Sequence, residues 1–179
     1  YNIHIVTRLD KNTTGICIFA KNEYIQELFV KKKNKINLKK EYTAIVNGII
    51  KEDHIIIEKD IARMNNTILL RETVPTGNGD YAKTEVEVLK RNNNLNYTVV
   101  NIILHTGRTH QIRVHMIDIG HILLGDTLYA KYYNIANIDS LILRQALHAR
   151  KVSMNHPITN KPLEIEAPLP EDMKSLINQ

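Results

Sequence analysis

The sequence contains a single cysteine and no long apolar run. Cys17 is the only cysteine among 179 residues, so the chain cannot form an internal disulfide, and one thiol suits a reducing compartment. No apolar stretch approaches the roughly 20 residues that a helix needs to cross a bilayer. Because 43% of the residues are hydrophobic, we expect a globular, cytoplasmic protein with one domain and its own core.

Several familiar catalytic motifs are also missing. No Gly-x-Gly-x-x-Gly or Walker pattern is present to bind a nucleotide through its phosphates. Neither Ser140 nor Ser153 lies in a Gly-x-Ser-x-Gly elbow, which argues against a serine hydrolase. His105, His110 and His115 are evenly spaced, but a five-residue step turns side chains to different faces of a strand or helix. With no cysteine pair and no His-Glu-x-x-His, we expect no metal site.

The charge is moderately basic and unevenly distributed. The formal net charge of +5 favours a polyanionic partner. Lysines crowd residues 31–40, whereas acidic residues concentrate at 82–88 and 164–172. One end of the molecule is therefore expected to be basic, and a solvated lysine run in a flexible loop is the alternative.

Apolar periodicity predicts more strands than helices. Strands are expected at residues 16–20, 40–48, 54–59, 67–74, 82–90, 97–104 and 149–154. Helices are expected at residues 22–29, 111–119, 141–147 and 171–177. Because helices and strands do not alternate regularly, the predicted fold class is α+β, a largely antiparallel sheet with helices packed on it.

Asp10 and Tyr42 are two candidates for chemistry. Asp10 lies in a polar loop before the strand expected at 16–20. A carboxylate there can act as a nucleophile, a general base or a metal ligand, or can simply form a turn. Tyr42 lies in the strand expected at 40–48, where a tyrosine can belong to the core or can face a ligand.

The start of the helix expected at 111–119 is a third candidate. It collects four residues with polar or basic side chains. They are Arg108, Thr109, His110 and, about one turn inside, Arg113. Helix N-termini present free N–H groups and a partial positive charge, so this point suits an anion.

Five blocks of sequence, spread in order over nearly the whole chain, resemble the RluA-type RNA pseudouridine synthase family. The blocks are Arg8-Leu9-Asp10-Lys11-Asn12-Thr13-Thr14-Gly15, Lys40-Glu41-Tyr42-Thr43-Ala44 with Gly48, Thr106-Gly107-Arg108-Thr109-His110-Gln111-Ile112-Arg113-Val114-His115, Gly125-Asp126-Thr127-Leu128-Tyr129, and Arg144-Gln145-Ala146-Leu147-His148-Ala149 with His156-Pro157. The resemblance implies a mixed, mostly antiparallel sheet with flanking helices.

The same resemblance implies an RNA uridine isomerase that needs neither a metal nor a cofactor. Asp10 would be the catalytic aspartate, and Tyr42 would stack on the target uracil. Arg113 would pair with the Asp10 carboxylate, because a guanidinium fork both favours and orients the charged form. Arg8 would fill the space that the target nucleotide vacates when it leaves its stack.

RNA would be the partner, with ribosomal RNA the more common target in the family and tRNA the next. The protein is expected to act as a monomer and away from membranes. Five further residues are expected to bind the RNA, mainly through its phosphates. They are Lys32, Lys33, Arg108, Thr109 and His110.

The chain departs from the family pattern at three points. Thr7 stands where the family commonly has His, and Thr14 replaces the usual serine. The Lys-Pro-x-Gly segment that normally precedes the aspartate loop is absent, as is an RNA-binding domain of the S4 type. Since the chain opens at Tyr1 without an initiator Met, we expect residues 1–179 to be an amino-terminally truncated catalytic domain.

Two other functions remain open from the sequence. A non-catalytic RNA-binding or chaperone module on the same scaffold would bind RNA and change no uridine. A hydrolase that uses Asp10 as a general base has less support, because no partner acid or metal set accompanies Asp10 in the sequence.

Overall fold

A computed structural model describes residues 2–65 and 67–179 of the chain. Tyr1, with which the expected domain opens, lies outside the described residues. No helix in the two described ranges is long and apolar enough to span a membrane.

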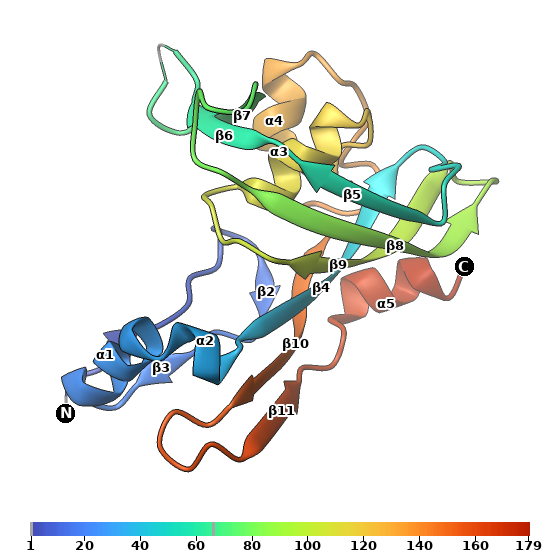
Figure 1. The fold of residues 1–179 in the computed structure, drawn as a ribbon. Helices are drawn as coiled ribbons and strands as arrows, with labels where there is room; N and C mark the ends of the chain where they lie inside the picture. Colours follow the sequence, from blue (N-terminus) through green and yellow to red (C-terminus); the bar gives the residue numbers. More distant parts are fainter. Residues whose placement is uncertain (1, 66) are drawn as a thin grey trace.

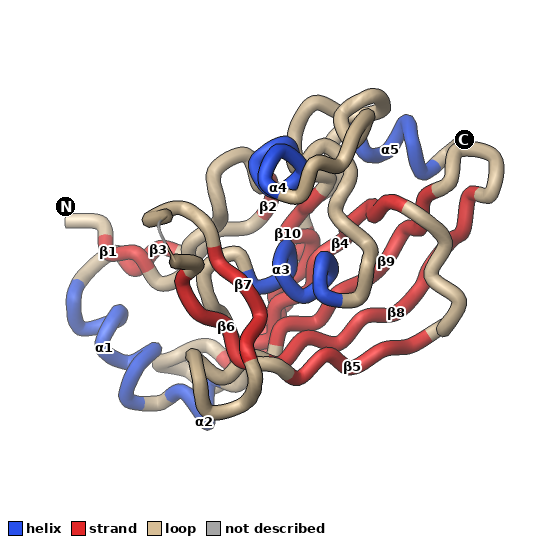
Figure 2. Tube along the Cα trace, turned by 90° about the horizontal axis from the view of Figure 1, so that it is seen from above, coloured by secondary structure: helices blue, strands red, loops and turns tan. Residues whose placement is uncertain are grey.

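A seven-stranded sheet forms the centre of the fold (Figures 1 and 2). Six strands follow the order β11–β10–β4–β9–β8–β5 in antiparallel pairs, and β2 pairs with β10 in parallel. The strands are β2 Thr14–Gly15, β4 Lys39–Asn47, β5 His54–Glu58, β8 Lys83–Asn92, β9 Tyr97–Leu104, β10 Leu147–Asn155 and β11 Pro162–Glu166. The fold is α+β with a mixed, mostly antiparallel sheet, as predicted.

The two faces of the sheet are covered by different helices. On β4, Ile45 points to one face and contributes to a core cluster with Met173 of α5 (Glu171–Ile177). Tyr42 points to the opposite face and shares a cluster with Met116 of α3 (Gln111–Asp118), as strand alternation requires. Figure 1 shows α3 and α5 on opposite sides of the sheet.

Smaller elements surround the sheet. Strands β1 (His4–Ile5) and β3 (Phe19–Ala20) pair with each other, and α1 (Glu23–Lys31) lies beside them. The remaining elements are α2 Lys33–Ile36, β6 Asp60–Arg63, β7 Arg71–Val74 and α4 Thr127–Tyr132. Strands β6 and β7 form a second two-stranded sheet near α3 and α4 (Figure 2).

Several predicted elements are confirmed within a few residues. The strand at 97–104 and the helix at 171–177 have the predicted bounds. The predicted helix at 22–29 begins one residue later, because Asn22 is its N-cap and accepts a hydrogen bond from the Ile25 N–H at 3.0 Å. The predicted strand at 82–90 is β8, whose Thr84 and Val86 are buried while Glu87 is exposed.

Other expectations were wrong. Residues 141–146 form no helix, because Ala146 hydrogen-bonds through its backbone to Leu124 and Ile45 instead of to its own turn. The strand expected at 16–20 exists only at its end, Phe19–Ala20. Strands β6 and β11 and the short helix α4 were not predicted.

Gly15 allows the Asp10 loop to reach the sheet, which leads to a first prediction. A β-carbon at Gly15, whose φ is +110°, would overlap the backbone carbonyl of Ala149 on β10. We expect Gly15→Ala to lower the free energy of unfolding, measured in urea, by more than Gly77→Ala. Gly77 has a similar φ of +92° but nothing within 4 Å of its added β-carbon. Gly77→Ala should therefore lower stability only through backbone strain, by about 1–3 kcal/mol. Equal losses would contradict the close approach.

Candidate active site

A pocket of about 620 Å³ opens between three segments that are distant in the sequence. Asp10 and Arg8 line it from the amino-terminal loop, Tyr42 from β4, and Ile112 from α3. A second hollow of about 830 Å³ adjoins it and shares Lys40 of β4 among its lining residues. The pocket is of the size that binds small molecules or single bases.

The segment around Gln145 holds the loop that carries Asp10. The Asp10 carbonyl closes a turn by accepting the Thr13 N–H at 3.0 Å. The side-chain amide of Gln145, which is buried, donates to the Lys11 carbonyl and to Thr13 Oγ1. Arg144 donates to the Asn12 carbonyl at 3.4 Å. These hydrogen bonds from Gln145 and Arg144 restrict the loop and therefore the position of the Asp10 carboxylate.

Hydrogen bonds also fix both ends of this loop. After it, the Thr14 hydroxyl lies 2.8 Å from Nδ1 of the buried His148. Before it, Thr7 accepts the Ile18 N–H on Oγ1 and the Cys17 thiol on its carbonyl, both at 2.9 Å. Thr7 therefore joins the segment before Asp10 to the segment around Cys17 and Ile18. Cys17 is half-buried and outside any strand, in contrast to the expected buried strand position.

Arg113 lies behind the pocket in a double salt bridge with Asp126. Its Nε donates to Oδ2 of Asp126 at 2.7 Å and its Nη2 to Oδ1 at 2.6 Å. Burial opposes the charged guanidinium, but the hydrogen bonds and charge of Asp126 outweigh that effect and raise the pKa of Arg113. The guanidinium also lies over the Tyr129 ring, 4.8 Å from its centroid.

Arg113 and Asp10 are neighbours at a longer distance. Nη1 of Arg113 lies 3.9 Å from Oδ2 of Asp10, whose side chain is 25% exposed. The structure therefore brings the two expected partners together, while Asp126 makes the closer pair. The sequence places Asp126 in one of the five blocks but indicates no role for its side chain. The signal for its role is general: a buried arginine in the interior requires a carboxylate to compensate its charge.

Tyr42 belongs both to the core and to the pocket wall. It is 7% exposed and packs in the cluster that contains Ile112 and Leu147, yet it also lines the pocket. Burial, followed by the nearby charge of Asp10, raises the pKa of Tyr42 to about 12. The phenol is therefore neutral at physiological pH.

His110 lines the same pocket beside Tyr129. The Tyr129 hydroxyl accepts the Arg71 N–H at 3.0 Å and lies 2.9 Å from Nδ1 of His110. Burial and the charge of Arg113 lower the pKa of His110, consistent with a neutral ring. His110 adopts φ of +57° as the N-cap of α3.

The other expected RNA-binding residues divide between two places. Arg8, Arg108 and Thr109 line the pocket and are exposed. Arg108 Nε donates to the Tyr81 carbonyl at 3.0 Å. Lys32 and Lys33 do not line this pocket. Lys32 contacts the Pro157 carbonyl at 3.4 Å, and Lys33 lines the second hollow.

Comparison with known proteins identifies the family. The sequence profile described as RNA pseudouridylate synthase matches residues 1–118. The chain belongs to the RNA pseudouridylate synthase family. This membership confirms the RluA-type resemblance of the five blocks.

Relatives of this synthase family match almost the whole chain. Uncharacterized RNA pseudouridine synthase YjbO of Bacillus subtilis (strain 168) is 38% identical over 175 residues, which are 98% of this chain and 58% of that protein. Ribosomal large subunit pseudouridine synthase D of Neisseria meningitidis (strain Z2491) is 38% identical over 180 residues, 97% of this chain and 47% of its own length. The chain thus spans about half the length of the curated relatives it matches.

A solved structure shares the fold of this pseudouridylate synthase chain. Human RNA Pseudouridylate Synthase Domain Containing 1 superposes with a TM-score of 0.78 at 22% sequence identity. The match covers 99% of this chain and 79% of the human chain. At this identity the likeness supports the fold alone.

The Arg113–Asp126 pair gives a second prediction. Arg113→Ala should lower the free energy of unfolding by about 3–5 kcal/mol, because it leaves the buried Asp126 carboxylate without a counter-charge. Lys174→Ala, which breaks an exposed pair with Glu171, should change stability little. Urea denaturation of both variants makes the comparison. Similar small losses in both would mean that the buried pair does not hold the site together.

Proposed function

We propose that the protein is an RNA pseudouridine synthase that isomerises specific uridines in structured RNA through Asp10. One observation carries the proposal. Asp10, Tyr42 and Arg8 line one pocket, and the guanidinium of Arg113 lies 3.9 Å from the Asp10 carboxylate. Family membership supports the reaction class. The pocket contains the carboxylate, the aromatic ring and the arginines that the proposed reaction uses.

The reaction conserves atoms and electrons. The bond between ribose C1′ and uracil N1 breaks, the freed uracil turns within the pocket, and a bond forms between C1′ and C5. The hydrogen on C5 leaves to solvent, and N1 gains a proton. Isomerisation therefore consumes no cofactor or oxidant, and the proposal includes no metal.

Asp10 provides the group that reacts. A carboxylate can attack the sugar, attack the ring, or accept a proton from the sugar, and can then depart again. In each case Asp10 would act as an anion, with the guanidinium of Arg113 3.9 Å from its carboxylate. Asp126 holds the guanidinium of Arg113 from behind, so Arg113 is a rigid positioning residue.

The target uracil must leave its stack before it can enter the pocket. Extrusion of a base costs a few kcal/mol, and an aromatic platform offsets part of that cost. Tyr42 is proposed as the platform and the exposed Arg8 as the side chain that fills the gap. Arg108, Thr109 and His110 would hold the flanking sugar and phosphates.

Ribosomal RNA is the proposed substrate, with tRNA as the second candidate. Several relatives are named Ribosomal large subunit pseudouridine synthase D, including those of Neisseria meningitidis and Haemophilus influenzae. A ribosomal RNA substrate and a single free cysteine also favour action in the cytoplasm. We propose that the described chain forms the catalytic domain and acts as a monomer.

Replacement of the Asp10 carboxylate tests the assignment directly. Asp10→Asn should abolish tritium release from RNA labelled at uridine C5, because an amide cannot act as the nucleophile or base. The assay uses the full-length protein and total RNA from cells that lack it. Asp139→Asn is the matched control, since Asp139 is exposed and outside the pocket. Turnover that persists in Asp10→Asn would refute the assignment. No turnover with the wild type would indicate a non-catalytic RNA-binding module.

A pair of substitutions tests Tyr42 as a stacking platform. Tyr42→Leu should lower kcat/KM by about 10- to 100-fold, since base–aromatic stacking contributes about 1–3 kcal/mol. Tyr42→Phe keeps the ring and should stay within a few-fold of the wild type. Because the pKa of Tyr42 is raised to about 12, its ionisation should leave no trace in the rate between pH 6 and 9. Equal losses in the two variants would contradict a role through the ring.

A further inference from the structure

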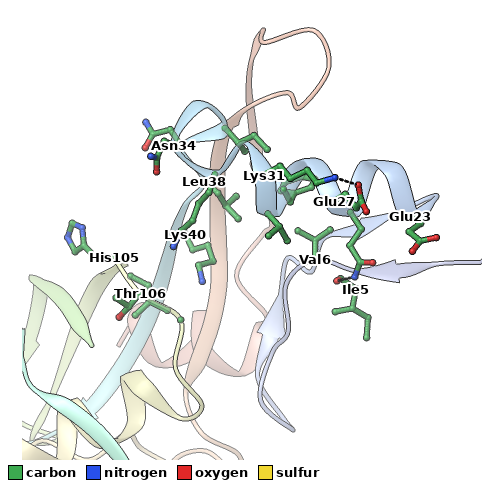
Figure 3. A pocket seen from close by; sticks show the side chains of 18 residues that line it. Ile5, Val6, Glu23, Glu27, Lys31, Asn34, Leu38, Lys40, His105 and Thr106 are labelled. Carbon is green, nitrogen blue, oxygen red and sulfur yellow. Dashed lines mark hydrogen bonds and ion pairs between the residues drawn. The ribbon is translucent and has the colours of Figure 1, made fainter. Parts of the chain in front are cut away.

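The hollow beside the candidate active site has no assigned function. It measures about 830 Å³ and lies between the α1–α2 segment on one side and the loop that carries His105 and Thr106 on the other (Figure 3). Five residues line both this hollow and the pocket of Asp10. They are Val6, Leu38, Lys40, Leu104 and Gly107. The two spaces therefore adjoin, and Lys40 lies at their boundary.

Lys40 has the properties of an anion-binding residue without an anion. It is half-buried on β4, two residues before Tyr42, so the two side chains leave the strand on the same face. Within residues 2–65 and 67–179, the side-chain amine of Lys40 makes no hydrogen bond or ion pair, although its backbone belongs to the sheet. Its amine lies close to Gly107, where an added β-carbon would come within 3.0 Å of Nζ.

A second lysine, Lys33, lines the same hollow. Burial lowers the pKa of Lys40, and the positive charge of Lys33 lowers it further. Glu23 and Glu27 also line the hollow, but in the described part of the chain neither forms an ion pair with Lys40 or Lys33. An anion placed near both lysines would stabilise their like charges. By contrast, the neighbouring Lys31 is already paired with Glu27 at 2.6 Å, so its charge is compensated.

We propose that this hollow is a second RNA subsite, which holds the nucleotide adjacent to the target uridine, with Lys40 on the phosphate that joins the two nucleotides. The inference rests on the proposed function, because the target uridine occupies the pocket of Asp10. An unstacked, single-stranded nucleotide fits the geometry, since the connection between the two spaces passes the Lys40 amine. Lys33 and the side-chain amide of Asn34 would contact the next phosphate or sugar.

Binding of a single-stranded oligonucleotide tests this subsite without catalysis. The probe is fluorescein-labelled heptauridylate, and fluorescence anisotropy with the full-length protein gives Kd between 50 and 200 mM salt. Lys40→Met should weaken binding about tenfold at the lower salt. Each lost contact with a single-strand phosphate should also reduce the slope of log K against log salt by about 0.7.

Lys39 provides the matched control. It is the adjacent lysine on the same strand, is exposed, and points to the other face. Lys39→Met should change Kd less than twofold and leave the slope unchanged. Lys40→Arg keeps the positive charge and should have the Kd and the slope of the wild type. Lys33→Met, at an exposed position, gives an independent test if Lys40→Met fails to fold, and it should also reduce the slope. Equal effects of Lys39→Met and Lys40→Met would overturn the subsite.

Cross-linking locates the bound strand. Heptauridylate that contains 4-thiouridine should cross-link to peptides from residues 31–37 and 105–107, as well as to the pocket of Asp10. Cross-links confined to the pocket would overturn the second subsite but would not contradict the proposed isomerisation by Asp10. Asp10→Asn should give the wild-type cross-links, so loss of activity in that variant is independent of this test. If a segment of protein occupies the hollow, residues 31–37 should give no cross-link and Lys40→Met should leave the salt slope unchanged. This result would also overturn the subsite.

Discussion

The buried salt bridge between Arg113 and Asp126 is the interaction on which the rest of the site depends. Two opposite charges in the interior are tolerated only when their geometry is good and their remaining hydrogen-bonding groups are satisfied. Here both guanidinium–carboxylate bonds are short, and Asp126 also accepts the Tyr129 N–H at 3.3 Å as the N-cap of α4. The guanidinium can therefore face Asp10 from a fixed position and move little when substrate binds.

Two residues from the carboxyl-terminal part of the chain, Arg144 and Gln145, hold the loop that carries the Asp10 carboxylate. Gln145 and Arg144 bind the loop that follows Asp10, and Arg144 is held in turn by two hydrogen bonds to Asp172 of α5. A site assembled from residues 10, 113 and 145 needs the complete sheet between them.

The sequence was sufficient for the fold class, for most strands and for the prediction that Asp10, Arg8 and Tyr42 lie near one another. Tyr97–Leu104 has a strong apolar alternation, and Asn22 is a strong cap, so local signals decided both. Residues 141–146 were misassigned because Ala146 bonds to Leu124, a partner that no local pattern reveals. The role of Asp126 was missed for the same reason. Its carboxylate acts through a contact with another helix.

Mapping of pseudouridines in total RNA shows whether Asp10 in this pocket isomerises uridine. The comparison uses cells that carry either the wild-type full-length protein or Asp10→Asn at equal abundance. We expect one or a few ribosomal RNA positions that are modified with the wild type and unmodified with Asp10→Asn. Identical maps in the two strains would contradict it.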